Sequence, residues 1–203
     1  MDEFDFLSRV PLAHPEAVAL ARCGAFDTFG KARPVLLWEI ELRAAATRTA
    51  AGATKGEGGG PAVDALAEKI PALADYGPQQ RRRAELDVLE MTLDAHPFAL
   101  FAPALERVRR LRPITPSDAL RRREGEEVYL LGWKVTAKRT STVNDEPMCF
   151  VTFCDEAGRF EASFFPEVYA RSALELVRGM GPFLIKGRVE VTLGAVEVVA
   201  SHL

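Results

Sequence analysis

Aromatic and basic side chains recur in the last third of the chain, in segments with the alternating apolar pattern of β-strands. These residue types suit single-stranded nucleic acid, because bases stack on aromatic rings and phosphates pair with cations. Phe150 is the main candidate for stacking. If Val151 and Phe153 fill the interior, Phe150 and Thr152 face outward. The alternative is that Phe150 packs beneath a loop.

The strand before it carries further candidates. Gly132 predicts a bulge, after which Lys134, Thr136 and Lys138 are expected on one face and Trp133, Val135 and Ala137 on the other. Trp133 is a candidate contact, although the pattern favours a core position. Lys138 and Arg139 lie near the loop between the first two strands, so they are candidates for phosphate contacts.

Two more basic segments are candidates with a plainer alternative. Lys186 and Arg188 share a face opposite Ile185 and Val189, which suits a groove wall or a hydrated outer surface. An arginine-rich stretch from Arg107 to Arg123 could lie against phosphates, each contact adding salt-dependent affinity. Such charge runs are more often solvated faces.

The elements that position these residues follow from periodicity. Strands are expected at 127–141, 148–154, 159–165, 183–191 and 195–202, with a helix from Pro166 to Arg178 between the third and fourth. Five strands with a helix in this place form the element order of an OB-fold, a small barrel that binds oligonucleotides. We therefore expect an α+β protein with helices first and a five-stranded OB-fold β-barrel last.

The chain before the barrel has a helical period, interrupted by a segment rich in glycine. We expect a helical region at 1–46, a flexible linker at 47–62, a helical connecting region at 63–125 and the barrel domain at 126–203. Helices are predicted at about 15–23 and from Pro34, separated by turns at Gly24 and Gly30.

Composition excludes several classes of protein. The net charge of −3, from 26 basic and 29 acidic residues, argues against a polybasic protein that binds by bulk charge. No apolar run is long enough for a bilayer, and three cysteines without paired spacing indicate a reducing, cytoplasmic setting. No phosphate-binding loop, nucleophile motif or metal spacing is present, so we expect no catalytic residue, metal or cofactor.

Three sequence blocks resemble one family, the bacterial C-family DNA polymerases (DNA polymerase III α subunits). The block from Val151 to Glu161, followed by Phe164-Phe165-Pro166, is similar to the family's OB-fold. Asp5–Val10 and Leu20–Gly30 resemble the latter part of its helix-hairpin-helix region, and Leu86–Pro97 resembles the segment before the OB-fold. The blocks occur in the family's order and cover nearly the whole chain.

The resemblance implies a non-catalytic, DNA-binding tail of such a polymerase, of the error-prone branch, acting in DNA replication or repair. The barrel would hold single-stranded template. The turn from Gly24 to Asp27, with Arg22 and Lys31 nearby, would hold duplex DNA through main-chain N–H groups. The polymerase chemistry would come from another chain, because the catalytic palm is absent.

The chain also departs from this family, and two rival functions stay open. Glu90 stands where the family often has glycine, and Gln79-Gln80 does not form a convincing peptide for binding the sliding clamp. The rivals are a standalone OB-fold protein that binds single-stranded DNA or RNA and a protein-interaction module with Phe150 and Trp133 in its core. Salt-dependent binding to oligonucleotides is expected of the polymerase tail and of the standalone OB-fold protein, but not of the protein-interaction module.

Overall fold

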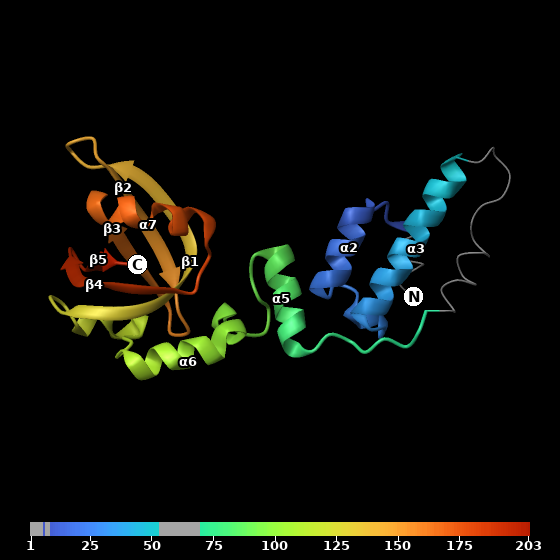
Figure 1. Cartoon of the computed structure of the whole chain (residues 1–203), viewed down its shortest axis with the longest axis horizontal. Coiled ribbons are helices and arrows are strands. Elements are labelled where there is room, and N and C mark those ends of the chain that lie inside the picture. Colours follow the sequence, from blue (N-terminus) through green and yellow to red (C-terminus); the bar gives the residue numbers. More distant parts are fainter. Residues whose placement is uncertain (1–5, 7–8, 53–69) are drawn as a thin grey trace. The chain divides into compact units, whose positions relative to one another are not determined.

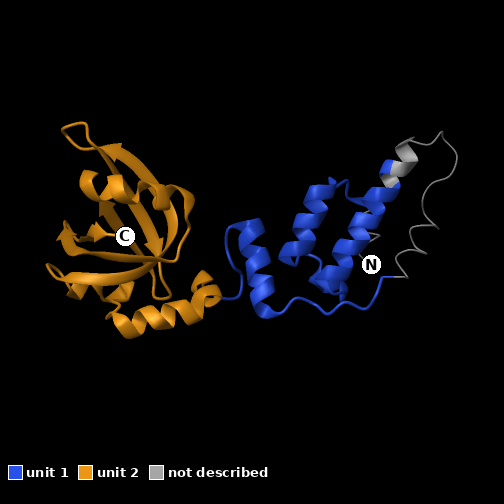
Figure 2. Cartoon of the chain, in the orientation of Figure 1, with its two compact units in different colours: residues 1–95 blue, residues 96–203 orange. Residues whose placement is uncertain are grey.

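The structure is a computed structural model that describes residues 6, 9–52 and 70–203. The chain forms two compact units, residues 1–95 and residues 96–203 (Figure 2). The boundary between the units lies within the connecting region expected at 63–125. Residues 78–89 of that region contact an N-terminal helix, and residues 117–122 contact strands of the barrel.

The first unit is helical. Its elements are α2 (His14–Cys23), the short 3₁₀ helix η1 (Asp27–Phe29), α3 (Arg33–Gly52) and α5 (Pro78–Leu89) (Figure 1). Pro15 lies in the first turn of α2, where its missing N–H costs nothing, and Gly24 ends the helix with φ of 90°. α2 packs against both α3 and α5. The core consists of Ala17, Ala21, Phe26, Leu36 and Ile40.

One sequence expectation in this unit differs from the structure. α3 continues to Gly52, past residue 47 where the linker was expected, because its alanine-rich last turns favour a helix. Glu90 ends α5 with φ of 58°, a left-handed conformation in which glycine is favoured. The expected linker from residue 53 on, the expected helical piece at 63–69 and part of the block Asp5–Val10 lie outside the described residues.

The second unit has helical segments followed by the barrel. The helical segments are η2 (Pro97–Phe101), α6 (Ala102–Leu111) and η3 (Ser117–Arg122). The barrel consists of β1 (Glu127–Ser141), β2 (Pro147–Cys154), β3 (Arg159–Phe164), α7 (Pro166–Arg178), β4 (Phe183–Thr192) and β5 (Ala195–His202). The five strands close in the order β1-β2-β3-β5-β4, parallel only between β3 and β5 (Figure 1). The expected α+β class and OB-like barrel are confirmed.

The barrel interior is filled by alternate side chains of the strands. Val151, Ile185, Val189 and Val198 are completely buried, and Phe153 lies among Phe160, Phe164 and Phe183 with ring centroids 5.5, 6.3 and 5.9 Å away. Val151 and Phe153 therefore fill the interior, as expected, and the neighbouring residues of β2 point outward. This alternation decides which side chains are available for binding.

The bulge in β1 lies at Val135 rather than at Gly132. Lys134 pairs with Phe153 and Thr136 pairs with Thr152, so one extra residue separates them. Gly132 instead makes room for packing, since a Cβ there would lie 2.9 Å from side-chain atoms of Ile185 and Phe153. The bulge reverses which residues of β1 face outward: Tyr129, Leu131 and Trp133 before it, Thr136 and Lys138 after it.

None of the helices in residues 6, 9–52 and 70–203 is long and apolar enough to cross a bilayer.

Candidate nucleic-acid interface

Phe150 lies on the outer face of the barrel, in the middle of three neighbouring strands. It pairs with Lys138 of β1 on one side and with Ser163 of β3 on the other. Phe150 is 38% exposed, so part of its side chain is open to water and the larger part is covered. Lys138 is exposed and has no ion-pair partner among the described residues. The pair offers a ring for stacking beside a free ammonium group.

The neighbouring positions of this face are polar and of mixed charge. Thr152, two residues after Phe150 on β2, lies on the same face between Thr136 of β1 and Glu161 of β3. Thr152 is half-buried and carries a hydroxyl group, a small donor or acceptor. We name the outer face formed by Lys138, Phe150, Thr136, Thr152 and Glu161 the β1–β3 face. Ser163, which pairs with Phe150, is completely buried and does not contribute to it.

Carboxylates border the β1–β3 face on one side. Glu161 pairs with Glu197 of β5, which in turn pairs with Glu190 of β4. Burial raises the pKa of the Glu197 carboxyl, and the nearby charges of Glu161 and Glu190 raise this pKa further. This acidic row repels phosphates, so an anionic strand on the face would keep to the β1 side, where Lys138 lies.

Trp133 does not reach the surface. It is only 6% exposed and packs against Phe101 of η2, with ring centroids 6.0 Å apart. Its side chain points away from the barrel interior, as its pairing with Cys154 shows, but the segment 97–101 covers it. Trp133 is therefore a core residue between the barrel and η2, the position that the pattern favoured, and its burial argues against a stacking role.

Lys134 and Arg139 are also removed from the β1–β3 face by the bulge. Lys134 points into the barrel end, where its ammonium group donates to the carbonyl oxygen of Leu176 in α7 at 2.6 Å. Burial lowers the pKa of Lys134. Arg139 pairs with Cys149, whose side chain is buried, whereas Lys138 pairs with outward-facing Phe150. Lys134 thus stabilises the last turn of α7, and Arg139, although exposed, alternates with Lys138 along the strand and pairs with a different residue of β2.

Lys186 and Arg188 lie on a different surface of the barrel. Both point outward from β4, opposite buried Ile185 and Val189, as expected. Their partners in the sheet are Tyr129 and Glu127 at the start of β1, not the strands that carry Phe150. Because β4 and β2 flank β1 on opposite sides, these cations do not form a wall of the β1–β3 face.

The arginine-rich stretch is only partly free for binding. Arg109 forms an ion pair with Glu156 at 2.6 Å, Arg123 pairs with Glu126 at 2.9 Å, and Arg121 donates to the carbonyl oxygen of Gly194 at 2.7 Å. The contacts of Arg109 and Arg121 join α6 and η3 to turns of the barrel, whereas the Arg123–Glu126 pair is local. Arg107 and Arg110 of α6 are exposed, without an ion pair among the described residues.

The hairpin between α2 and α3 does not offer the donors that were expected of it. The N–H groups of Gly24, Ala25 and Asp27 donate to carbonyl oxygens of the hairpin itself, those of Ala21, Leu20 and Gly24. Lys31 is bound to Glu39, with Nζ 2.9 and 3.1 Å from the two carboxylate oxygens. Gly24 and Lys31 therefore have structural roles, which argues against a duplex-binding site at these residues.

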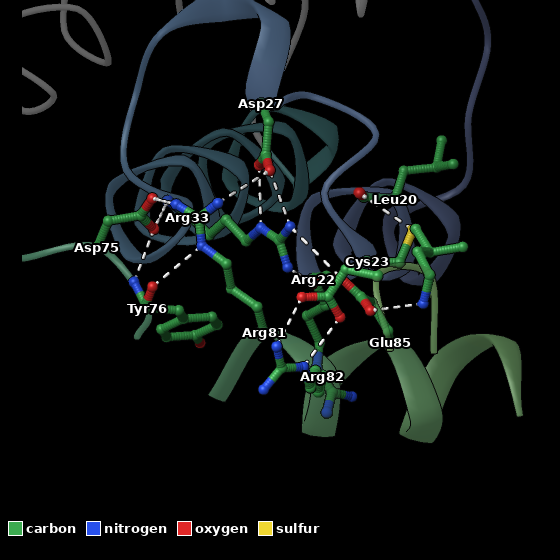
Figure 3. Close-up of polar contacts among 12 residues, drawn as sticks. Leu20, Arg22, Cys23, Asp27, Arg33, Asp75, Tyr76, Arg81, Arg82 and Glu85 are labelled. Atoms are coloured by element: carbon green, nitrogen blue, oxygen red, sulfur yellow. Dashed lines mark hydrogen bonds and ion pairs between the residues drawn. The ribbon is translucent and has the colours of Figure 1, made fainter. Parts of the chain in front are cut away.

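Arg33 explains why the hairpin turn is closed. Its guanidinium group is buried and donates to both carboxylate oxygens of Asp27, at 2.9 and 2.8 Å, and to the carbonyl oxygen of Arg22 at 3.0 Å (Figure 3). A Cβ at position 24 would lie 2.1 Å from this group, so only glycine fits there.

The same arginine connects the hairpin to the chain after residue 69. The Arg33 N–H donates to the Asp75 carboxylate at 3.0 Å, and Glu85 of α5 lies 3.9 Å from the guanidinium group (Figure 3). Arg81 of α5 binds the same Asp75 carboxylate. The hydrogen bond to Asp27 raises the pKa of Arg33. This buried network holds the first unit together.

The structure brings His96 and Cys154 into contact, 58 residues apart in sequence. Nε2 of His96 lies 3.3 Å from Sγ of Cys154, while Nδ1 accepts a hydrogen bond from the Phe98 N–H at 3.3 Å. The proton of the neutral ring is therefore on Nε2 and faces the sulfur. Burial lowers the pKa of His96 and raises that of Cys154, so both groups are kept neutral. His96 cannot act as the base of a cysteine nucleophile in this arrangement.

The reactivity of Cys154 tests this reading. We expect iodoacetamide to alkylate Cys154 slowly at neutral pH, with a rate that rises at a midpoint above the ordinary cysteine pKa of 9.0, because only the thiolate reacts. Mass spectrometry of the peptide that contains Cys154 measures the rate. Rapid alkylation at neutral pH would show an activated thiolate and contradict the neutral pair.

No group of three or more histidine, cysteine, aspartate or glutamate side chains within the described residues is arranged to hold a metal ion.

Sequence reasoning missed three surface residues around the candidate interface. Arg159 at the start of β3 is exposed, and its pairing with Cys154 places it on the outer side of the barrel. Phe165 directly follows β3 and is 45% exposed. Tyr129 lies between cations on the β1–β4 side. The alternation of Arg159 and Glu161 with buried Phe160 and Ala162 was the available signal for Arg159.

Comparison with known proteins relates the chain to polymerases. No protein-family model matches it. It is 29% identical over 209 residues to the error-prone DNA polymerase of Symbiobacterium thermophilum, covering 96% of this chain and 19% of that protein. It is 27% identical over 200 residues to the error-prone DNA polymerase of Mycobacterium tuberculosis, and the match covers 98% of this chain and 17% of that protein. It is 30% identical over 168 residues to the error-prone DNA polymerase of Burkholderia pseudomallei, and the match covers 82% of this chain and 14% of that protein.

The chain thus spans less than a fifth of the length of these relatives. It is homologous over nearly its whole length to a segment of error-prone DNA polymerases.

Proposed function

We propose that this chain is a non-catalytic, nucleic-acid-binding part of an error-prone DNA polymerase, corresponding to the C-terminal region of such enzymes. Its barrel holds single-stranded template during replication or translesion synthesis in the cytoplasm, while another part of the polymerase supplies the chemistry. The similarity to polymerase segments and the OB-like barrel support this proposal.

The observation that carries the proposal is the exposed ring of Phe150 beside Lys138. An exposed phenylalanine in the middle of a sheet costs solvation free energy that a polar residue would avoid. A base that stacks on it removes the ring from water, and Lys138 lies within one strand spacing to pair with the adjacent phosphate. Thr152, on the same face, can bond a base edge or a sugar hydroxyl.

The charges around Phe150 give the bound strand a preferred path. Lys138 lies on the β1 side, and the row of Glu161, Glu197 and Glu190 lies on the β3–β5 side. Phosphates therefore run along the β1 side of Phe150, with the bases pointing across β2.

Two substitutions at Phe150 test the stacking. Phe150→Leu keeps apolar volume but removes the aromatic face, whereas Phe150→Tyr keeps the face. Since stacking contributes about 1–3 kcal/mol per base, Phe150→Leu should weaken binding to a short oligothymidylate by about 5- to 150-fold, and Phe150→Tyr should bind like the native chain. Fluorescence anisotropy of a labelled oligonucleotide measures both affinities.

The comparison also separates stacking from simple apolar contact. Equal affinity of the Leu and Tyr variants would mean that the aromatic face contributes nothing, and the β1–β3 face would then not be the binding surface. Thermal melting of both variants checks that the barrel is intact, which is expected because the side chain of Phe150 is partly exposed.

A further inference from the structure

A second cationic surface lies around Tyr129, on the side of the barrel formed by β1 and β4. The guanidinium carbon of Arg112, at the end of α6, lies 5.4 Å from the centre of the Tyr129 ring. Nζ of Lys186 lies 5.9 Å from the same ring centre. The backbone of Tyr129 is fixed as well, since its carbonyl oxygen accepts a hydrogen bond from the Thr115 N–H at 2.8 Å. The ring thus holds two cations near each other.

The charges on this surface are not balanced. Glu127 binds Lys186, with an oxygen 2.8 Å from Nζ, and so neutralises one of the cations. Arg188 pairs with Glu127 in the sheet and points outward, near Gly125. Neither Arg112 nor Arg188 has an ion-pair partner among the described residues. Two exposed guanidinium groups are therefore not held in ion pairs, although the carboxylate-bearing residues Glu127 and Glu190 neighbour Arg188 in the sheet. We name the surface formed by Arg112, Tyr129, Lys186 and Arg188 the β1–β4 surface.

This surface is separate from the β1–β3 face. Between Tyr129 and the bulge, the outward side chains of β1 are Leu131 and Trp133, which are 3% and 6% exposed. Phe101 packs on Trp133, and Phe98, with Leu131, lines a cavity of about 410 Å³ in the same unit. Apolar packing therefore interrupts the outer face of β1, and no continuous charged groove joins Lys138 to the β1–β4 surface.

We infer that the β1–β4 surface is a second binding site, for the phosphodiester backbone of nucleic acid. Guanidinium groups form paired hydrogen bonds to phosphate oxygens, and an ammonium group adds a point charge. The site recognises backbone rather than bases, because the ring of Tyr129 is half-buried with two cations already close to it. Binding there should be independent of sequence. The inference rests on the proposed function but uses none of the residues that carry it.

The test removes the two unbalanced charges. Arg112→Gln with Arg188→Gln keeps the length of the side chains and leaves the Lys186–Glu127 pair in place. The full chain is titrated with a labelled oligothymidylate of about 30 nucleotides and with a duplex of about 30 base pairs, at about 50 to 200 mM salt. The control is Arg171→Gln with Arg178→Gln on α7, which removes the same charge from two other exposed arginines.

We expect the Arg112/Arg188 variant to bind more weakly and to lower the slope of log affinity against log salt by about two units, one for each lost phosphate contact. Loss with both probes indicates a site for either form of backbone, and loss with one probe identifies which form it takes. If the variant binds both probes like the Arg171/Arg178 control, the inference is overturned.

The same titration separates this inference from the proposed function. Phe150→Leu reports on the β1–β3 face, preferably with a probe of about eight nucleotides that fits one barrel. A lowered salt slope in the Arg112/Arg188 variant, with no effect of Phe150→Leu, would support the β1–β4 surface and reject stacking at Phe150. If only Phe150→Leu weakens binding, stacking at Phe150 is supported and the β1–β4 surface is rejected as a binding site.

Discussion

Arg33→Ala is expected to destabilise the first unit by about 3 kcal/mol, because it removes one partner of a buried ion pair. The Arg33 side chain is only 4% exposed, and Glu85, which lies 3.9 Å away, is almost as well buried at 7%. Without the guanidinium group, the buried Glu85 carboxylate loses one of its nearby cations, and the carbonyl oxygen of Arg22 loses its donor. Hydrogen exchange of the α2 and α3 amides measures the loss of stability in the first unit separately from the second unit.

Arg82→Ala is the matched control for this prediction. Arg82 binds Asp94 with the same paired geometry, at 2.9 and 2.8 Å, but Asp94 is exposed to solvent. Water screens this pair, so its removal should change exchange much less. If Arg33→Ala and Arg82→Ala increase exchange equally, the buried network does not hold the hairpin to α5.

Phe153→Ala is expected to destabilise the barrel by about 3–5 kcal/mol, the usual cost of removing a buried phenylalanine. Phe153 is fully buried and touches three other rings from β3 and β4, so its loss leaves a cavity that the closed sheet cannot fill by collapsing. Denaturant unfolding followed by Trp133 fluorescence measures the change. The chain has two tryptophans, and Trp38→Phe, at an exposed position, leaves Trp133 as the only reporter.

Phe150→Ala provides the control on the same strand. It removes the same side chain three residues away, but from the outer face, where 38% of the side chain is exposed. The barrel should lose much less stability than with Phe153→Ala, although nucleic-acid binding should fall. Similar destabilisation by the two substitutions would mean that Phe150 is a core residue and would remove the basis of the proposed function.

Most of the fold could be predicted because its signals are local. Strand periodicity needs only neighbouring residues, and the structure confirms all five strands to within one residue, together with the helix Pro166–Arg178. Helix ends at Cys23 and Arg178 were also marked, the first by the glycine that follows it. The barrel order and the OB-like class then follow from element order.

The candidate site was predicted only in part. Phe150 and Thr152 face outward as expected, since β2 alternates without interruption. Lys134 and Trp133 were assigned to the wrong faces, because the bulge lies three residues after its expected position and the residues between the two positions exchange faces. Gly24 was interpreted as a binding turn, but the side chain of Arg33 closes it from nine residues away.

The sequence by itself determined the five strands and the outward direction of Phe150, because alternation along a strand is set by backbone geometry over a few residues. The tertiary structure decided which cations share a surface: it paired Lys138 with Phe150 and brought Arg112 and Lys186 to the ring of Tyr129. These contacts join residues 12 to 57 positions apart, and they depend on barrel closure and on the bulge at Val135. Periodicity along the chain contains no information about either.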